Sequence, residues 1–105
     1  MNDAIVVYID PELEDLIPGF LANRRRDVES LRLLLGQGDY AAIRLIGHSM
    51  KGAGGGYGFD PITEYGDQIE TAALEGKGDV ILAVTAALAD YLARVRPVLA
   101  ESENE

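Results

Sequence analysis

The fold is decided by the segment Asp79–Val98, which reads DVILAVTAALADYLARVRPV. Its apolar residues recur at alternating steps of three and four positions. Because an α-helix turns once in about 3.6 residues, this spacing places them on one stripe of a single helix. A glycine-containing break at Gly76–Gly78 precedes the segment, and Asp79 is expected to cap the start of the helix. The stripe consists of Ile81, Val84, Leu88, Tyr91, Val95 and Val98.

The same helical spacing appears in three further segments upstream. The first ends at the turn Gly36–Gly38, and Asp39 is expected to cap the second. The third starts at Asp60–Pro61, an expected N-cap followed by proline at the first helical position. The three apolar faces consist of Ile17, Leu21, Val28, Leu31 and Leu35; of Tyr40, Ile43, Ile46 or Gly47, and Met50; and of Ile62, Tyr65, Ile69 and Ala73.

Four amphipathic helices joined by short glycine-rich turns predict an all-α fold, an antiparallel up-down four-helix bundle. Pro18 fits the first turn of a helix better than its interior, so Pro11–Ile17 is expected to form a short extra N-terminal helix or turn. The strand-like run Ile5–Ile9 has no recognisable partner run and is interpreted as an extended lead-in. We expect one domain over residues 1–105, with acidic, frayed ends at 1–10 and 101–105.

Composition excludes several classes of function. The chain of 105 residues has a formal net charge of −9, which argues against a nucleic-acid partner because no net basic surface exists to displace counterions. The absence of cysteine excludes disulfides and thiolate zinc sites, and with a single histidine no metal site is expected. There is no signal peptide and no apolar stretch of about 18 residues, so we expect a cytoplasmic protein without a membrane partner.

The charge is unevenly distributed along the chain. Residues 24–51 carry six basic and three acidic side chains, a net of +3, and this stretch contains the only histidine, His48. The histidine opens a glycine-rich segment that extends to Phe59. Neither a phosphate-binding loop of the Walker type nor a G-x-G-x-x-G fingerprint fits that segment, and no strand precedes it. These mismatches argue against a loop that binds a nucleotide phosphate.

His48 lies off the apolar stripe of its helix, one turn from Arg44, Lys51 and Gly52. A lone histidine in a helix is most often a residue without a chemical role, but two cations beside an exposed imidazole give no evident stabilisation. Neutral imidazole is a good nucleophile, and nearby cations suit an incoming phosphoryl group with about two negative charges. A missing side chain at Gly52 leaves room for a donor. The pattern favours a phosphoryl acceptor.

The motif His48-Ser49-Met50-Lys51-Gly52, with Gly58 six residues further on, resembles the H-x-x-K-G-x-x-x-x-x-G signature of histidine-containing phosphotransfer (HPt) domains. The resemblance covers roughly residues 12–100. Gly47 departs from the family, which more often has alanine there, and is expected to soften the helix without touching the chemistry. The run Gly54–Gly56 is richer in glycine than usual and is interpreted as a tightly packed or mobile helix exit. The likeness continues through Phe59, Ile62, Tyr65, Ile69-Glu70 and Ala73.

The resemblance implies that His48 accepts a phosphoryl group on Nε2 from the phospho-aspartate of a receiver domain and passes it to another receiver. Lys51, with Arg44 as a second candidate, would neutralise the phosphoryl charge, and Gly52 would provide steric clearance. Gln68 or Glu70 would orient the imidazole. An apolar rim around His48 would dock the receiver. No cofactor is expected on this chain, because Mg²⁺ would come with the receiver.

The leading hypothesis is a stand-alone, monomeric phosphocarrier of a multistep two-component phosphorelay. Its expected partners are response-regulator receiver domains, the receiver of a hybrid histidine kinase, or both. It is not expected to be an enzyme, since it has no nucleotide-binding signature for ATP-dependent kinase activity. The alternative is a helical-bundle module that binds a receiver or kinase without carrying phosphate.

Overall fold

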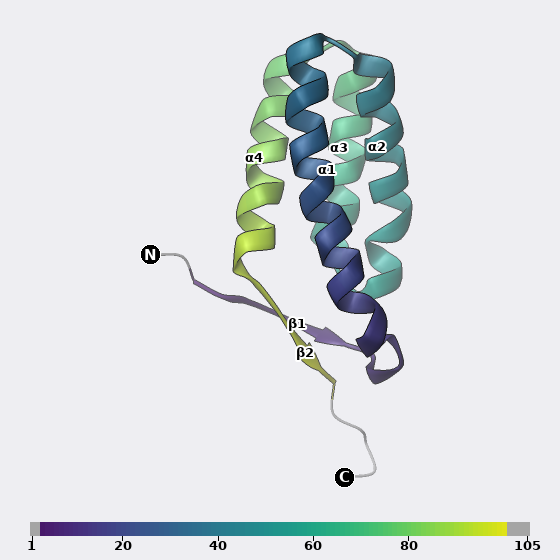
Figure 1. Cartoon of the computed structure of the whole chain (residues 1–105), viewed down its shortest axis with the longest axis vertical. Coiled ribbons are helices and arrows are strands. Elements are labelled where there is room, and N and C mark those ends of the chain that lie inside the picture. The colour runs from purple at the N-terminus through teal and green to yellow at the C-terminus, as the bar shows by residue number, and fades with distance from the viewer. Residues whose placement is uncertain (1–2, 101–105) are drawn as a thin grey trace.

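Four long helices run side by side along the length of the molecule in the computed structural model (Figure 1), which describes residues 3–100. The helices are α1 (Ile17–Gln37), α2 (Tyr40–Ala53), α3 (Asp60–Leu74) and α4 (Gly78–Arg94). Two 3₁₀ turns, η1 (Pro11–Leu16) and η2 (Gly55–Tyr57), precede α1 and α3. This confirms the predicted bundle and its short extra N-terminal helix. Within the described residues, no helix is long and apolar enough to cross a membrane.

The turn residues and N-caps predicted from the sequence agree with the structure only in part. Gly38, with φ of 70°, ends α1, and the Asp39 carboxylate accepts a hydrogen bond from the backbone N–H of Ala42 at 3.1 Å, as predicted. The capping roles expected of Asp60 and Asp79 are wrong, because α3 starts at Asp60 itself and α4 starts one residue before Asp79. Both carboxylates lie in first turns instead, where they interact favourably with the helix dipole.

A small parallel sheet differs from the sequence prediction. Strand β1 (Ile5–Ile9) pairs with β2 (Val95–Leu99), from Ile5 opposite Val95 to Ile9 opposite Leu99. The predicted stripe of the last helix extended through this second strand, but Pro97 has no N–H and disfavours helical backbone at the residue before it. The helix therefore ends at Arg94, and the partner for Ile5–Ile9 lies in a segment whose apolar spacing predicts a helix.

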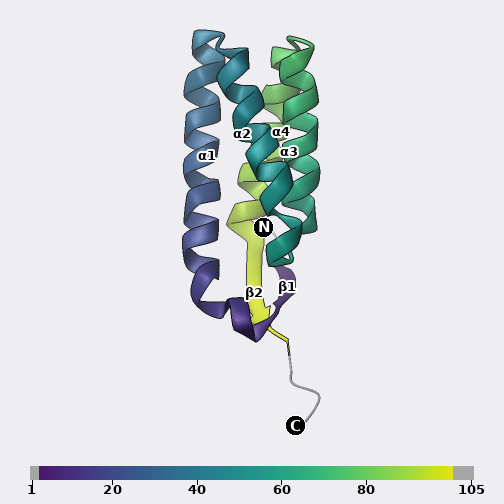
Figure 2. The same cartoon turned by 90° about the vertical axis from the view of Figure 1, so that its right-hand side faces the viewer.

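The N-terminal segment is accordingly not a frayed lead-in. Ile9 is 1% exposed and belongs to the hydrophobic core. The sheet lies beyond one end of the bundle, at the opposite end from the α1–α2 turn (Figures 1 and 2). The expected fraying of residues 1–10 thus fails for the strand, while residues 1–2 and 101–105 lie outside the described residues.

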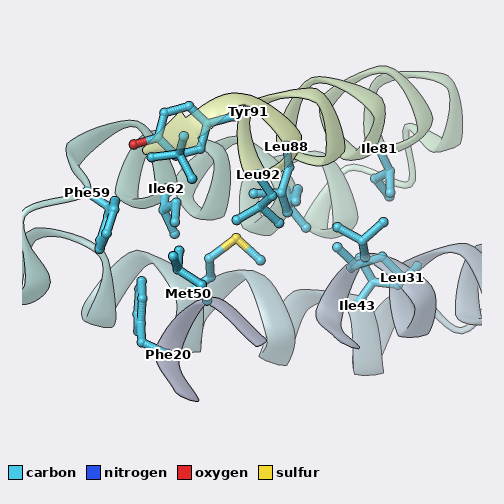
Figure 3. Packing of buried hydrophobic residues seen from close by; sticks show 14 of the residues in the cluster. Phe20, Leu31, Ile43, Met50, Phe59, Ile62, Ile81, Leu88, Tyr91 and Leu92 are labelled. Atoms are coloured by element: carbon cyan, nitrogen blue, oxygen red, sulfur yellow. The ribbon is translucent and has the colours of Figure 1, made fainter. Parts of the chain in front are cut away.

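The core runs the length of the bundle and follows the predicted stripes. Figure 3 shows the rings of Phe20 and Phe59 towards one end and Leu31, Ile43 and Ile81 towards the other. The two phenylalanine rings stack with centroids 5.4 Å apart. The predicted stripe residues that are fully or almost fully buried are Ile17, Leu21, Val28, Leu31, Ile43, Met50, Ile62, Ile69, Ala73, Ile81, Leu88, Tyr91 and Val95.

Tyr91 gives a prediction for stability and its dependence on pH. Its side chain is buried, and its hydroxyl has no hydrogen-bond partner within residues 3–100. Because an unpaired buried hydroxyl costs free energy, Tyr91→Phe should raise the free energy of unfolding by about 1 kcal/mol. Burial also raises the pKa of Tyr91 to about 12. Since an unfolded tyrosine has a pKa near 10, wild type should lose stability as the pH rises from about 10 to 12.

Urea unfolding at pH 8 and pH 11 tests both effects, with Tyr8→Phe as the control because Tyr8 is 70% exposed. Tyr91→Phe should be less sensitive to alkaline pH than wild type and than the control. A destabilised Tyr91→Phe protein at pH 8 would contradict the account, since it would mean that the hydroxyl has a partner.

Candidate functional site

Helices α2 and α3 touch through their backbones at Gly47 and Gly66. A Cβ atom at Gly47 would lie 2.7 Å from the backbone nitrogen of Glu70 and 2.9 Å from the carbonyl oxygen of Gly66. A Cβ atom at Gly66 would collide with the backbone nitrogen of Lys51. Both glycines are buried, and the two helices lie side by side in Figure 2. Gly47 therefore permits close helix packing, a role that differs from the predicted softening of the helix.

This close approach joins four polar side chains, which we call the α2–α3 ladder: His48, Lys51, Asp67 and Glu70. His48 Nδ1 lies 3.1 Å from Glu70 Oε2. The Lys51 ammonium lies 3.7 Å from Glu70 Oε1 and 3.1 Å from Asp67 Oδ1. His48 and Lys51 are three residues apart on α2, and Asp67 and Glu70 are three residues apart on α3. The two residues on each helix therefore lie on the same face of that helix. The carboxylate of Glu70 thus connects the histidine to the lysine.

The geometry at His48 distinguishes its two ring nitrogens. An ionised carboxylate can only accept a hydrogen bond, so the contact with Glu70 requires the neutral imidazole to carry its proton on Nδ1 and to donate it. Nε2 then has the free lone pair. The His48 side chain is 70% exposed, whereas Glu70 is only 16% exposed. The arrangement therefore presents an unprotonated ring nitrogen to solvent from a ring that is anchored at its other nitrogen.

Lys51 is charged and already paired. Its side-chain hydrogen bond with Asp67, followed by the negative charges of Asp67 and Glu70, raises the pKa of the lysine above its ordinary value. Lys51 lies one turn after His48 on α2. Asp67 is not among the site residues predicted from the sequence, although it lies three residues before Glu70 on the same helix, a spacing that was a visible signal.

The remaining predicted site residues differ in how closely they approach His48. Gly52 is exposed, and a Cβ atom there would meet nothing within 4 Å, which agrees with open space beside the histidine. Arg44 is half-buried one turn before His48 and has no ion-pair partner among residues 3–100. Gln68 is exposed and has no hydrogen bond to His48. Because Gln68 is turned about 200° around α3 from Glu70, only Glu70 of these two candidates is hydrogen-bonded to the ring.

The glycine-rich helix exit is packed at its start. A Cβ atom at Gly54 would lie 2.6 Å from the backbone nitrogen of Thr63 in α3. The Gly54 carbonyl also accepts a hydrogen bond from the N–H of Phe59 at 2.9 Å. Gly58, with φ of 91°, completes the turn in a conformation that favours glycine. These contacts fix the connection between the two helices that carry the ladder.

Comparison with known proteins supplies a family match. The model of the Hpt domain matches residues 15–97, which is most of the chain. Neither a curated protein nor a solved structure gives a significant match. The matched region contains the whole α2–α3 ladder.

The glycine before the motif and the glycine within it are predicted to respond in opposite ways to alanine. Gly47→Ala should lower the free energy of unfolding by about 1–3 kcal/mol, because the new Cβ overlaps backbone atoms of α3 and the whole helix would have to shift to make room. Gly52→Ala should raise it by up to about 1 kcal/mol, because the new methyl group enters open space and helix propensity improves. Urea unfolding of both variants measures these changes. Equal stability of the two variants would show that the helices do not meet at Gly47.

Proposed function

Because this chain belongs to the Hpt domain family, whose members are phosphoryl carriers of phosphorelays, we propose that it relays phosphoryl groups between receiver-domain aspartates through His48. The observation that carries the proposal is the exposed imidazole whose Nδ1 lies 3.1 Å from Glu70. Hpt domains typically have receiver domains as partners. The proposal extends this to the acceptor atom and to the roles of the neighbouring side chains.

Transfer to His48 is a displacement at phosphorus. The lone pair of Nε2 forms the N–P bond while the P–O bond of the receiver's acyl phosphate breaks, and the aspartate leaves as a carboxylate. Nδ1 keeps its proton, so no base is needed to remove one during the step. The phosphorylated ring carries a positive charge, which the Glu70 carboxylate beside Nδ1 stabilises. Glu70 is therefore a positioning residue that also favours the charged product ring.

Charge and space around Nε2 suit the phosphoryl group. Lys51 lies one turn after His48 and Arg44 one turn before it, so both cations can approach a group with about two negative charges. The open space at Gly52 allows the receiver's active site to come close. The receiver supplies the Mg²⁺ ion in this proposal, and the present chain supplies the nucleophile and the two cations.

Exposed leucines on the same two helices support docking of a receiver at this face. Leu45, on α2 one turn before His48, is 60% exposed, and Leu74, on α3 one turn after Glu70, is 68% exposed. Large apolar side chains that are this exposed contribute to binding when a partner covers them. We infer that they form part of the apolar rim around the histidine.

The proposal predicts that phosphate label moves from a phosphorylated receiver to this protein and is lost in His48→Gln. The label should be acid-labile and base-stable, as expected of a phosphohistidine. Because His48 is the only histidine in the chain, no other imidazole can accept the label. Incubation with each phosphorylated receiver of the source organism, followed by acid and base treatment, is the measurement.

Circular dichroism of His48→Gln should match that of wild type, since the side chain is exposed and contributes nothing to the core. Wild-type protein that binds a receiver but takes up no label would instead support the module that binds a partner without carrying phosphate. Label retained in His48→Gln would refute the assignment of the acceptor.

A further inference from the structure

The lysine of the ladder is shared between two carboxylates before any phosphoryl group arrives. Lys51 lies closer to Asp67, at 3.1 Å, than to Glu70, at 3.7 Å. The Lys51 and Asp67 side chains are 47% and 57% exposed, so their ion pair is accessible to solvent and can exchange partners. Glu70 is fixed from both sides, because its other oxygen contacts His48. Within residues 3–100, the only ionic contact of Asp67 is thus the lysine.

Phosphorylation changes the competition for this lysine. The neutral imidazole becomes a cationic ring that carries a phosphoryl group with about two negative charges. Asp67 and the phosphoryl oxygens then compete for the Lys51 ammonium, which lies 3.1 Å from Asp67 before the phosphoryl group arrives. A carboxylate that competes for the cation lowers the stabilisation that the phosphoryl group receives.

We propose that Asp67 is a positioning residue that restrains Lys51, so that the phosphoryl group on His48 is weakly neutralised and is readily passed on. This inference rests on the proposed function of His48. In the outgoing step the N–P bond breaks, Nε2 regains its lone pair, and an aspartate carboxylate of the receiver forms the new P–O bond. Nδ1 keeps its proton beside Glu70. Weak pairing with Lys51 favours this step, because the ion pair between Lys51 and the phosphoryl group has to be broken when the group leaves.

The test measures the phosphoryl group directly. Phosphoramidate phosphorylates imidazole nitrogen without a protein donor, and the single histidine makes the ³¹P signal specific to His48. In Asp67→Asn the lysine has lost its nearest carboxylate, so it can pair more strongly with the phosphoryl group and favour its dianion. The pKa of the phosphoryl group, read from the ³¹P shift between pH 5 and pH 9, should fall by about 0.3–0.7 units, the size expected of an exposed ion pair.

Two further variants separate the role of the lysine from simple loss of charge. Glu75→Gln removes a carboxylate from another ion pair of the region, with Lys77 at 3.0 Å, and should leave the phosphoryl pKa unchanged. Asp67→Asn should have no effect in a Lys51→Gln background, because the residue acts through the lysine. Arg44, Glu70 and the Nδ1–H of His48 are the other charged and titratable groups near the phosphorylated ring; they are unchanged in Asp67→Asn, Glu75→Gln and Lys51→Gln and are common to all comparisons.

The inference is overturned if Asp67→Asn leaves the phosphoryl pKa at the wild-type value, or if the shift persists in the Lys51→Gln background. It is also overturned if Glu75→Gln gives the same shift, since net charge would then account for the result. With a phosphorylated receiver as donor, Asp67→Asn should move the transfer equilibrium about two- to fivefold towards phosphohistidine. Failure of all variants, including wild type, to exchange phosphate with any receiver would refute the proposed function instead, while the ³¹P titration would still test Asp67.

Discussion

The candidate site depends on one steric constraint, the direct backbone contact between α2 and α3 at Gly47 and Gly66. A methyl group at either position would overlap backbone atoms of the facing helix. Because the two helices approach this closely, the polar side chains of the ladder on one helix reach those on the other. The 3.1 Å contact between His48 and Glu70 follows from that approach, and so does the tautomer that leaves Nε2 free. The same two glycines therefore allow both the close packing of α2 on α3 and the hydrogen bond that places the proton on the His48 ring.

The sequence contains enough local information to predict the helices but not the end of the last one. Apolar spacing locates the four helices, and Asp39 marks the start of one of them by a cap that the structure contains. The spacing continues through Val95 and Val98, but backbone chemistry at Pro97 ends the helix first. The strand that results pairs with residues about 90 positions away, so neither partner could be recognised from its neighbours. Long-range pairing of this kind leaves no periodic signal in a single sequence.

The candidate site shows the same division. His48, Lys51 and Gly52 lie within one turn of each other, so helical spacing alone associates them. Glu70 was one of two candidates on the neighbouring helix, and only the packing of α2 on α3 distinguishes it from Gln68. Asp67 was missed because its importance comes from a contact across the helix pair. Gly47 was assigned a local effect because its facing partner, Gly66, is nineteen residues further along the chain.

Phosphoryl transfer through Nε2 depends most directly on the proton that His48 donates from Nδ1 to Glu70. Ring ¹⁵N NMR of the unphosphorylated protein at a pH where the imidazole is neutral measures where that proton is. We expect a protonated Nδ1 and an unprotonated Nε2 in wild type, and loss of this preference in Glu70→Ala. A wild-type ring protonated on Nε2 would refute the role of Nε2 as acceptor, because the exposed nitrogen would then lack the lone pair that accepts the phosphoryl group.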